Sequence, residues 1–462
     1  MLKLTKWGIW GYFLLLIFEG ALRKWIVPGM ADILLVVRDP VVFAIYAGAI
    51  AAGRIPRNPF IGFIAAMAGA SVVFSFMAGQ SNLVVLAYGI RTNYLHLPLI
   101  FVMAEVLDRE DVEKMGTWVL LLGLANAALM VQQFRSSSGA WVNVGVGGEE
   151  GTQIHGAGGR IRPPGFFSFI IGPTVFLPIF TAFILHQASA GRRVWFPVLI
   201  ACGLGLAVAL PVSISRGTMI AALLVGATFT AGLLRLGLLN MAMVRLALVS
   251  LGVLAALSFT PVFDEARSAF MDRWTIAANE SGGRGWGSLI DRVAGVAGVP
   301  VYYLTEAPLF GHGVGYGSSV AARLLTGKRG FLLAEDEWSK CYLELGPLLG
   351  SAFLIFRVLL VAYLFKLAWK ALNQHRDTLP LMLWAAVAPT TILFYQWAQP
   401  TVLGFAAFGG GLIAASVNYV DDEDEEEDDD EDEEDDSGDE EPEETPEPES
   451  PLQHQRRRMR GL

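Results

Sequence analysis

The chain has only two cysteines and few charged residues. Cys202 and Cys341 provide neither a disulfide framework nor the spacing of a metal site. Charged residues make up 17% of the sequence, whereas apolar residues make up 53%. A soluble chain of 462 residues needs more polar surface than this, so the composition indicates a membrane protein.

The sequence also lacks a nucleotide-binding fingerprint. Its glycine run at residues 311–317 (Gly-His-Gly-Val-Gly-Tyr-Gly) follows no expected strand and has the wrong spacing for a dinucleotide motif. Such a run is typical of a flexible turn, and it also allows backbone N–H groups to approach an anion such as diphosphate. Both interpretations stay open, and we expect neither a cofactor nor a metal ion.

Long apolar runs dominate the chain. A helix needs about 20 apolar residues to cross a hydrocarbon core of about 30 Å. This criterion predicts an all-α polytopic membrane protein with about twelve transmembrane helices. The expected spans are 7–22, 31–52, 60–79, 83–106, 115–134, 165–186, 194–212, 218–236, 241–260, 346–368, 379–397 and 400–420.

Lysine and arginine in the short loops predict the orientation of these spans, because positive loops stay in the cytoplasm. They predict that both termini are cytoplasmic. Residues 135–164 and 261–345 then form the long external loops, the second between spans nine and ten. Arg23 and Lys24 oppose this assignment, since they fall on the external side.

The C-terminal residues 421–462 differ from the predicted membrane domain, residues 1–420. Residues 421–450 contain 23 aspartates and glutamates, so the net charge of −10 describes the tail and not the membrane body. A self-repelling run with almost no apolar residues predicts a disordered acidic tail. Either a solvated tail or a docking segment for basic partners fits this composition.

Two expected spans carry charges, which cost at least about 2.5–3.5 kcal/mol at the bilayer centre. Arg38 and Asp39 are adjacent and are expected to neutralise each other near an interface. In the fourth span, Arg91 and Tyr94 share a helical face, and His96 lies nearby. This face is either the wall of a cavity or a set of interhelical hydrogen bonds.

The external side collects several arginines. Arg216 lies in the short turn Ser213–Thr218, and Arg160 and Arg162 precede the sixth span. Guanidinium groups match phosphate oxygens in bidentate pairs. The arginines therefore suit a lipid diphosphate leaving group, while an external carboxylate or histidine removes a proton from an attacking hydroxyl.

In these features the chain resembles the superfamily of bacterial O-antigen ligases and O-antigen polymerases. The resemblance covers roughly residues 1–420 and rests on the order of the motifs. These are the entry Arg162-Pro163-Pro164-Gly165-Phe166-Phe167, the turn Ser215-Arg216, the glycine run 311–317 and the segment Glu344-Leu345-Gly346.

The resemblance implies a GT-C-like helical fold in the bacterial inner membrane. It implies metal-independent transfer of an undecaprenyl-diphosphate-linked glycan to an acceptor hydroxyl at the periplasmic face. The implied partners are the lipid-linked oligosaccharide, the glycan acceptor, membrane lipids and a chain-length regulator or other biosynthesis protein, with no nucleic acid. The implied process is synthesis of O-antigen or exopolysaccharide.

The ligases carry a catalytic histidine nine residues before the glutamate of Glu-x-Gly, and here this position is Glu335. We therefore expect Glu335 to be the base, with Glu337 and His312 as alternatives. The missing histidine argues against a lipid-A-core ligase and favours a polymerase or a divergent exopolysaccharide branch. A transporter or flippase for lipid-linked glycans is the alternative function. The expected substrate-binding residues are Arg162, Arg216, Arg284, Arg292 and Arg91.

Overall fold

The computed structural model describes residues 1–149, 153–156, 159–189, 194–238, 261–280, 287–327 and 330–419. Residues 1–419 form one compact unit, and the predicted acidic tail lies outside the described residues. The described part is helical throughout, and its one antiparallel bridge joins His155 to Ile161.

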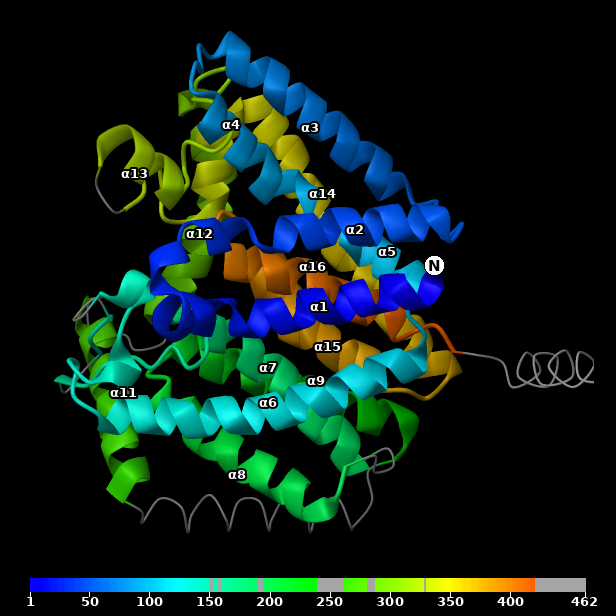
Figure 1. The fold of residues 1–462 in the computed structure, drawn as a ribbon, viewed down its shortest axis with the longest axis vertical. Coiled ribbons are helices and arrows are strands. Elements are labelled where there is room, and N and C mark those ends of the chain that lie inside the picture. The colour runs from blue at the N-terminus through cyan, green and yellow to red at the C-terminus, as the bar shows by residue number, and fades with distance from the viewer. Residues whose placement is uncertain are drawn as a thin grey trace, which may run out of the picture. The chain divides into compact units, whose positions relative to one another are not determined.

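The described helices follow the apolar runs of the sequence (Figure 1). The α-helices are α1 (Leu2–Ala21), α2 (Arg38–Ala51), α3 (Pro59–Met77), α4 (Leu83–Ile90), α5 (Leu99–Val106), α6 (Arg109–Arg135), α7 (Ile171–Ser189), α8 (Phe196–Val212), α9 (Arg216–Leu236), α11 (Pro261–Glu280), α12 (Gly287–Glu306), α13 (Ser319–Thr326), α14 (Glu337–Gln374), α15 (Leu379–Val387) and α16 (Pro400–Ala415). Shorter 3-10 or π-helical turns are η1 (Leu22–Ile26), η2 (Pro28–Met30), η3 (Ile33–Val36), η4 (Arg91–Leu95), η5 (Trp141–Asn143), η6 (Val146–Gly148) and η8 (Ala388–Ile392).

The structure supports a helical membrane protein. Seven described helical segments are long and apolar enough to cross a bilayer, and the segments that contain α8, α15 and α16 are apolar but shorter. Every expected span overlaps a helix except 241–260, which lies outside the described residues. The count of twelve spans and the GT-C-like arrangement stay predictions.

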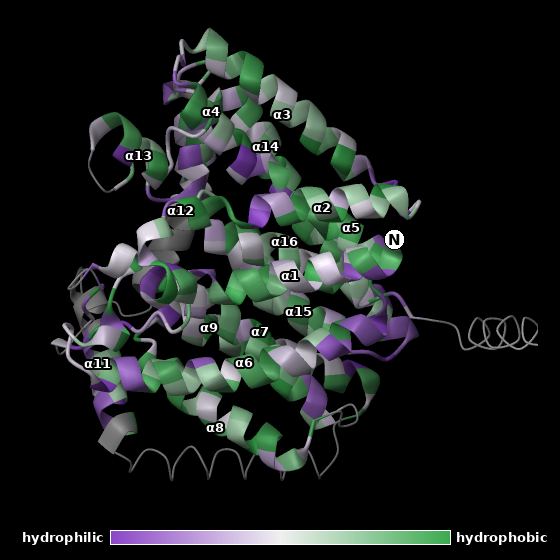
Figure 2. Cartoon of the chain, viewed as in Figure 1, coloured by the Kyte–Doolittle hydropathy of each residue, from purple (hydrophilic) through white to green (hydrophobic). Residues whose placement is uncertain are grey.

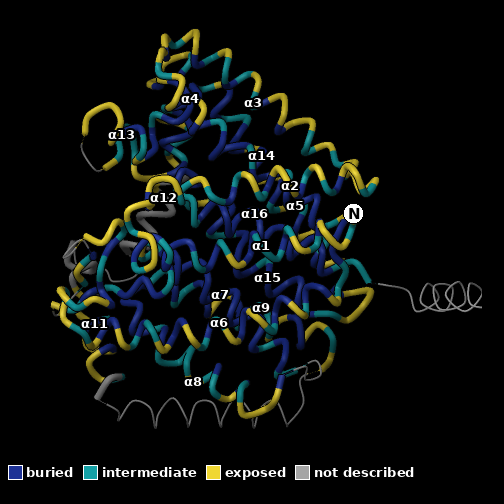
Figure 3. Tube along the Cα trace, viewed as in Figure 1, coloured by how far each residue is buried: buried dark blue, intermediate teal, exposed yellow. Residues whose placement is uncertain are grey.

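The packing places α7 and α16 at the centre. α16 packs against α5, α7 and α15, and α7 packs against α6 and α9. Nearly every residue of α16 is buried, whereas α3, α8 and α9 expose large apolar side chains (Figure 3). Figure 2 shows apolar residues along α3 and α8 at the periphery. An apolar surface this extensive is expected to face lipid and not water.

Close helix contacts in the centre depend on glycine. A Cβ atom on Gly410 would lie 3.0 Å from Cδ1 of Ile100, and one on Gly409 would lie 2.7 Å from Cγ2 of Val387. Small residues let helix backbones approach closely where no hydrophobic effect operates between helices. α16 therefore fits tightly against α5 and α15.

The predicted external loop 261–345 is largely helical. It contains α11, α12 and α13, followed by the start of α14. α12 packs against α14, and α11 packs against α8. The loop is therefore folded onto the helical bundle, and its ends approach the segments described below.

Candidate functional site

The turn between α8 and α9 holds Arg216 in a fixed position. Ile214 has a positive φ of 47° although it is β-branched, and its side chain is buried. The hydroxyl of Ser213 accepts the N–H of Ser215, and the hydroxyl of Ser215 accepts the N–H of Thr218 at 3.3 Å to cap α9. A strained, fully bonded turn of this kind is typical of a functional position.

Three separate segments meet at this turn. A Cβ atom on Gly156 would lie 2.7 Å from Cδ1 of Ile214 and 3.2 Å from Cγ of Arg162. A Cβ atom on Gly217 would lie 3.3 Å from the hydroxyl oxygen of Tyr395. The structure therefore brings the loop that carries Arg162, the turn that carries Arg216 and the segment around Tyr395 together, and both arginines are partly buried.

The segment 393–400, between η8 and α16, connects this turn to α14 and α2. Its carbonyl groups accept hydrogen bonds from four side chains, one of them that of Tyr88, whose hydroxyl donates to the carbonyl of Ala398 at 3.4 Å. The carbonyl of Leu393 accepts Nε1 of Trp338 at 3.0 Å, that of Tyr395 accepts Nη2 of Arg357 at 2.9 Å, and that of Pro400 accepts Nη2 of Arg38 at 2.6 Å. Side chains bind these carbonyls. Substitution of the donor side chains is therefore expected to displace Tyr395.

The first turns of α14 contain a buried charge cluster. Nη1 of Arg357 pairs with Glu337, and Nζ of Lys340 lies 3.2 Å from the other carboxylate oxygen of Glu337. Nζ of Lys340 also lies 3.9 Å from Glu344. All four side chains are about 1% exposed or less. Glu337 is therefore held in two ion pairs, which favours a structural role for it over that of a base.

The other two candidate bases are exposed. Glu335 precedes Asp336, whose carboxylate accepts the N–H of Ser339 at 2.8 Å and caps α14. On its other side, the carbonyl of Ala334 accepts Nε2 of Gln396 at 3.0 Å. Glu335 is thus exposed, but both of its neighbours in the chain are hydrogen-bonded. The partner of Ala334 is Gln396, which follows Tyr395 in the sequence. His312 is exposed within the glycine run.

The glycine run supports the bend of α14. Gly346 interrupts this helix with φ 76°, and Pro347 has no N–H to donate to the carbonyl of Leu343. The N–H of His312 donates to that carbonyl at 2.7 Å, and the N–H of Gly313 donates to the carbonyl of Glu344 at 3.0 Å.

Two further N–H groups of the run also have protein acceptors. Val314 donates to the hydroxyl of Ser75 at 3.0 Å, and Gly317 donates to Oε1 of Glu344 at 2.6 Å. A Cβ atom on Gly89 of α4 would lie 2.5 Å from the nitrogen of Gly315, so the run also fits closely against that helix. These contacts favour a structural connector over an anion-binding loop.

A second buried charge cluster joins α1, η1 and α2. The carboxylate of Glu19 lies 3.3 Å from Nη1 of Arg23 and 3.0 Å from Nε of Arg38. Asp39 instead pairs with Arg91 and with Nε2 of His96. The expectation that Arg38 and Asp39 neutralise each other was wrong, because each finds its partner on another helical segment.

The polar face of the fourth span is used for hydrogen bonding between helices. The hydroxyl of Tyr94 lies 2.6 Å from that of Ser71, and Nδ1 of His96 lies 2.9 Å from the hydroxyl of Tyr12. Arg91 binds Asp39 and donates to the carbonyl of Leu35 at 2.9 Å. These contacts favour the hydrogen-bonding interpretation over the cavity wall, and they give Arg91 a structural role.

Lys24, which opposed the predicted orientation, is buried. Its Nζ donates to the carbonyl of Gly165 at 2.7 Å and lies 4.1 Å from the centre of the Trp25 ring. Burial lowers the pKa of Lys24 to about 7. Because the folded pKa is below the unfolded value of 10.5, the unfolded chain binds more protons between these values, and this residue's contribution to stability falls as the pH falls from 10.5 to 7.

We expect Lys24→Met to remove this pH dependence. The thermal unfolding midpoint of the wild-type protein should rise relative to that of the variant between pH 7 and pH 10. Unfolding in detergent, followed at several pH values, measures the difference. A constant difference between the two proteins would show that Lys24 titrates normally.

The structure does not describe the side chains of the remaining predicted site residues. Arg284 lies outside the described residues, and Arg292 lies in α12 but its side chain is outside the described part. Among the described residues, no group of three or more histidine, cysteine, aspartate or glutamate side chains has the arrangement of a metal site.

Sequence reasoning assigned no role to Glu19 and did not predict its ion pairs with Arg23 and Arg38. A charged residue within an apolar run was the available signal for each.

No protein-family model matches the chain, and no curated protein matches it.

Proposed function

We propose that the chain is a polytopic glycosyltransferase of the bacterial inner membrane. It polymerises, or ligates, glycan units linked to undecaprenyl diphosphate at the periplasmic face, during synthesis of O-antigen or exopolysaccharide. The observation that carries this proposal is the meeting of the Arg162 loop, the Arg216 turn and the Tyr395 segment. Two guanidinium groups from separate loops beside a fixed turn suit the two phosphates of a lipid diphosphate.

The proposed reaction needs a nucleophile, a base and a stabilised leaving group. The acceptor hydroxyl attacks the anomeric carbon of the donor sugar, and the bond from that carbon to the diphosphate oxygen breaks. Glu335 takes the proton of the hydroxyl, and the diphosphate leaves with its negative charge bound by Arg162 and Arg216. Glu335 and His312 are both exposed, whereas Glu337 is buried, and we prefer Glu335 as the base because it occupies the position of the ligases' catalytic histidine.

The transporter alternative depends on Arg38, Arg91 and His96 as a central pathway. Each of these side chains binds protein groups, namely Glu19, Asp39 and Tyr12 respectively, with Asp39 shared by Arg91 and His96. Side chains that already bind protein groups in this way stabilise one arrangement of the helices, which argues against a transport pathway there. We therefore prefer the glycosyltransferase.

Glu335→Gln is expected to lower the rate of glycan transfer about 100-fold or more, because an amide cannot accept the proton. The measurement is chain extension by the purified protein in lipid nanodiscs with a lipid-linked donor. Glu306→Gln is the matched control, since Glu306 is an exposed acid at the end of α12. Wild-type chain length in the Glu335 variant would remove this residue from the base role.

A further inference from the structure

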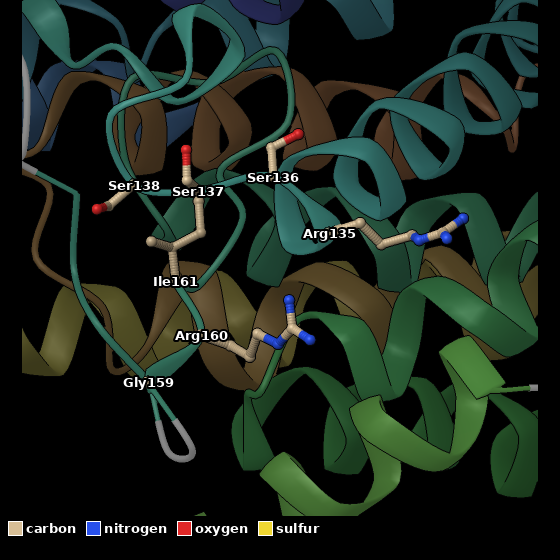
Figure 4. A pocket seen from close by; sticks show the side chains of 7 residues that line it. All are labelled: Arg135, Ser136, Ser137, Ser138, Gly159, Arg160 and Ile161. Carbon is tan, nitrogen blue, oxygen red and sulfur yellow. The ribbon is translucent and has the colours of Figure 1, made fainter.

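A polar pocket lies between the end of α6 and the loop before α7. Its volume is about 500 Å³, which is within the range of small-molecule sites. Figure 4 shows its lining, in which Arg135 and Arg160 extend to the same side of the view while the serine side chains point in other directions. Arg135, Ser136, Ser137 and Ser138 come from the helix end, and Gly159, Arg160 and Ile161 come from the loop.

Buried amides fix the rim of this pocket. Nδ2 of Asn143, a residue with no exposed surface, lies 2.8 Å from the carbonyl of Ser137, 3.1 Å from that of Gln133 and 3.4 Å from that of Ser136. The side chain of Gln133 in turn accepts the N–H of Gly165 at 2.8 Å. The serine segment is therefore held by protein contacts, so the pocket is formed before any ligand binds.

The lining is rich in cations and hydrogen-bond donors. Nη2 of Arg160 lies 2.7 Å from Glu265 of α11, and its guanidinium group lies over the ring of Phe134. Arg135 is exposed and pairs with no acidic side chain of the part of the chain that the structure describes. Two arginines against one glutamate leave the pocket positive, and guanidinium groups bind carboxylates strongly.

The segment that follows the serines carries an exposed tryptophan, which packs against the half-buried Trp25. Trp141, in η5, is 69% exposed, and its carbonyl accepts Nε1 of Trp25 at 3.1 Å. The two rings are 6.2 Å apart and nearly perpendicular. Trp141 is not among the residues that line the pocket, but it follows Ser138 closely in the chain, and Asn143 ties η5 to the serine segment. An aromatic face next to hydroxyl and guanidinium donors suits the apolar face of a sugar ring.

We propose that this pocket binds an acidic sugar unit of the glycan chain, one that carries a carboxylate. Arg135 and Arg160 contact the carboxylate, the three serines contact sugar hydroxyls, and Trp141 stacks on the ring. The ligand competes with Glu265 for Arg160, so binding loosens the contact between α11 and the loop before α7. This inference rests on the proposed function, and it adds the class of sugar that the protein holds apart from the diphosphate.

The test is binding of tetragalacturonate to the full chain in nanodiscs, with maltotetraose as the neutral probe and no lipid-linked donor present. Isothermal titration calorimetry should detect tetragalacturonate but not maltotetraose. Arg135→Gln should weaken binding about tenfold, because it removes a charge-assisted hydrogen bond. Trp141→Ala should weaken it and Trp141→Phe should not. Arg54→Gln, an exposed arginine between α2 and α3, should leave it unchanged.

Absence of tetragalacturonate binding would overturn the proposal. Equal binding of both probes would overturn the assignment to an acidic sugar, and unchanged binding by the Arg135 variant would overturn the location. Since no transfer occurs in this assay, its failure leaves the glycosyltransferase proposal untouched. Conversely, normal transfer by the Glu335 variant would not affect the pocket.

Discussion

Arg216→Lys is expected to lower the rate of glycan transfer about 10- to 100-fold. Lysine keeps the charge but replaces a planar fork of donors by a single ammonium group, so it cannot bind two phosphate oxygens in a bidentate pair. Loss of one hydrogen bond to a charged group costs about 1.5–3 kcal/mol, which corresponds to this range of rates. The measurement is single-turnover transfer from a lipid-linked donor in nanodiscs.

The fixed turn strengthens this prediction. Ile214 has φ 47° and Ser215 caps α9, so the backbone at Arg216 has little freedom to move a shorter-reaching side chain toward the substrate. Arg235→Lys is the matched control, because Arg235 lies in the last turn of the same helix and is exposed. Equal transfer by wild-type protein and the Arg216 variant would show that the diphosphate binds elsewhere.

Apolar run length predicted the helices well because one physical requirement, covering a hydrocarbon core, acts along each run independently. The sequence located both ends of α3 and α9 within two residues, whereas α6 begins at Arg109, before the expected start at residue 115. The sequence also predicted that Arg162 and Arg216 lie in successive loops on the external side, and that side stays a prediction. The contact between those loops at Gly156 was not predictable, because a glycine that fits between two segments leaves no periodic pattern.

Charged residues within the spans were harder to assign. Arg38 and Asp39 are neighbours in sequence, and proximity favoured their pairing. A helix directs adjacent side chains about 100° apart, so Arg38 reaches Glu19 of α1 while Asp39 reaches Arg91 and His96. The packing of α1 against α2 determines the partner of Arg38, and the position of residues 91–96 beside α2 determines those of Asp39.

The role of the glycine run depends on α14, a segment that is separate from it in the sequence. The closely spaced glycines of the run allowed either a flexible turn or an anion-binding loop, whereas two of its N–H groups bind carbonyls near Pro347. The proline signal was visible in the sequence, since a proline within a helix leaves a carbonyl without its usual donor. Nothing in the sequence indicated which segment supplies the replacement.

Arg357→Met is expected to destabilise the fold by about 3–5 kcal/mol, because it leaves a buried carboxylate short of a partner. Glu337 would keep only Lys340, and the carbonyls of Ile392 and Tyr395 would lose the donors that bind them at 2.7 and 2.9 Å. The thermal unfolding midpoint in detergent, read from the fraction that stays monodisperse, measures the effect. Lys370→Met is the matched control, because Lys370 is exposed on the same helix.

A double variant distinguishes the contribution of the Glu337–Arg357 ion pair to stability from that of the other contacts of Arg357. Glu337→Gln together with Arg357→Met removes the unpaired carboxylate, so it should recover part of the lost stability, although the two carbonyls stay without a donor. If the double variant is as unstable as Arg357→Met, the carbonyl bonds and the contact with Trp397 dominate instead. Because Arg357 holds the carbonyl of Tyr395, both variants should also lower glycan transfer through the displaced segment 393–400, whereas Lys370→Met should not.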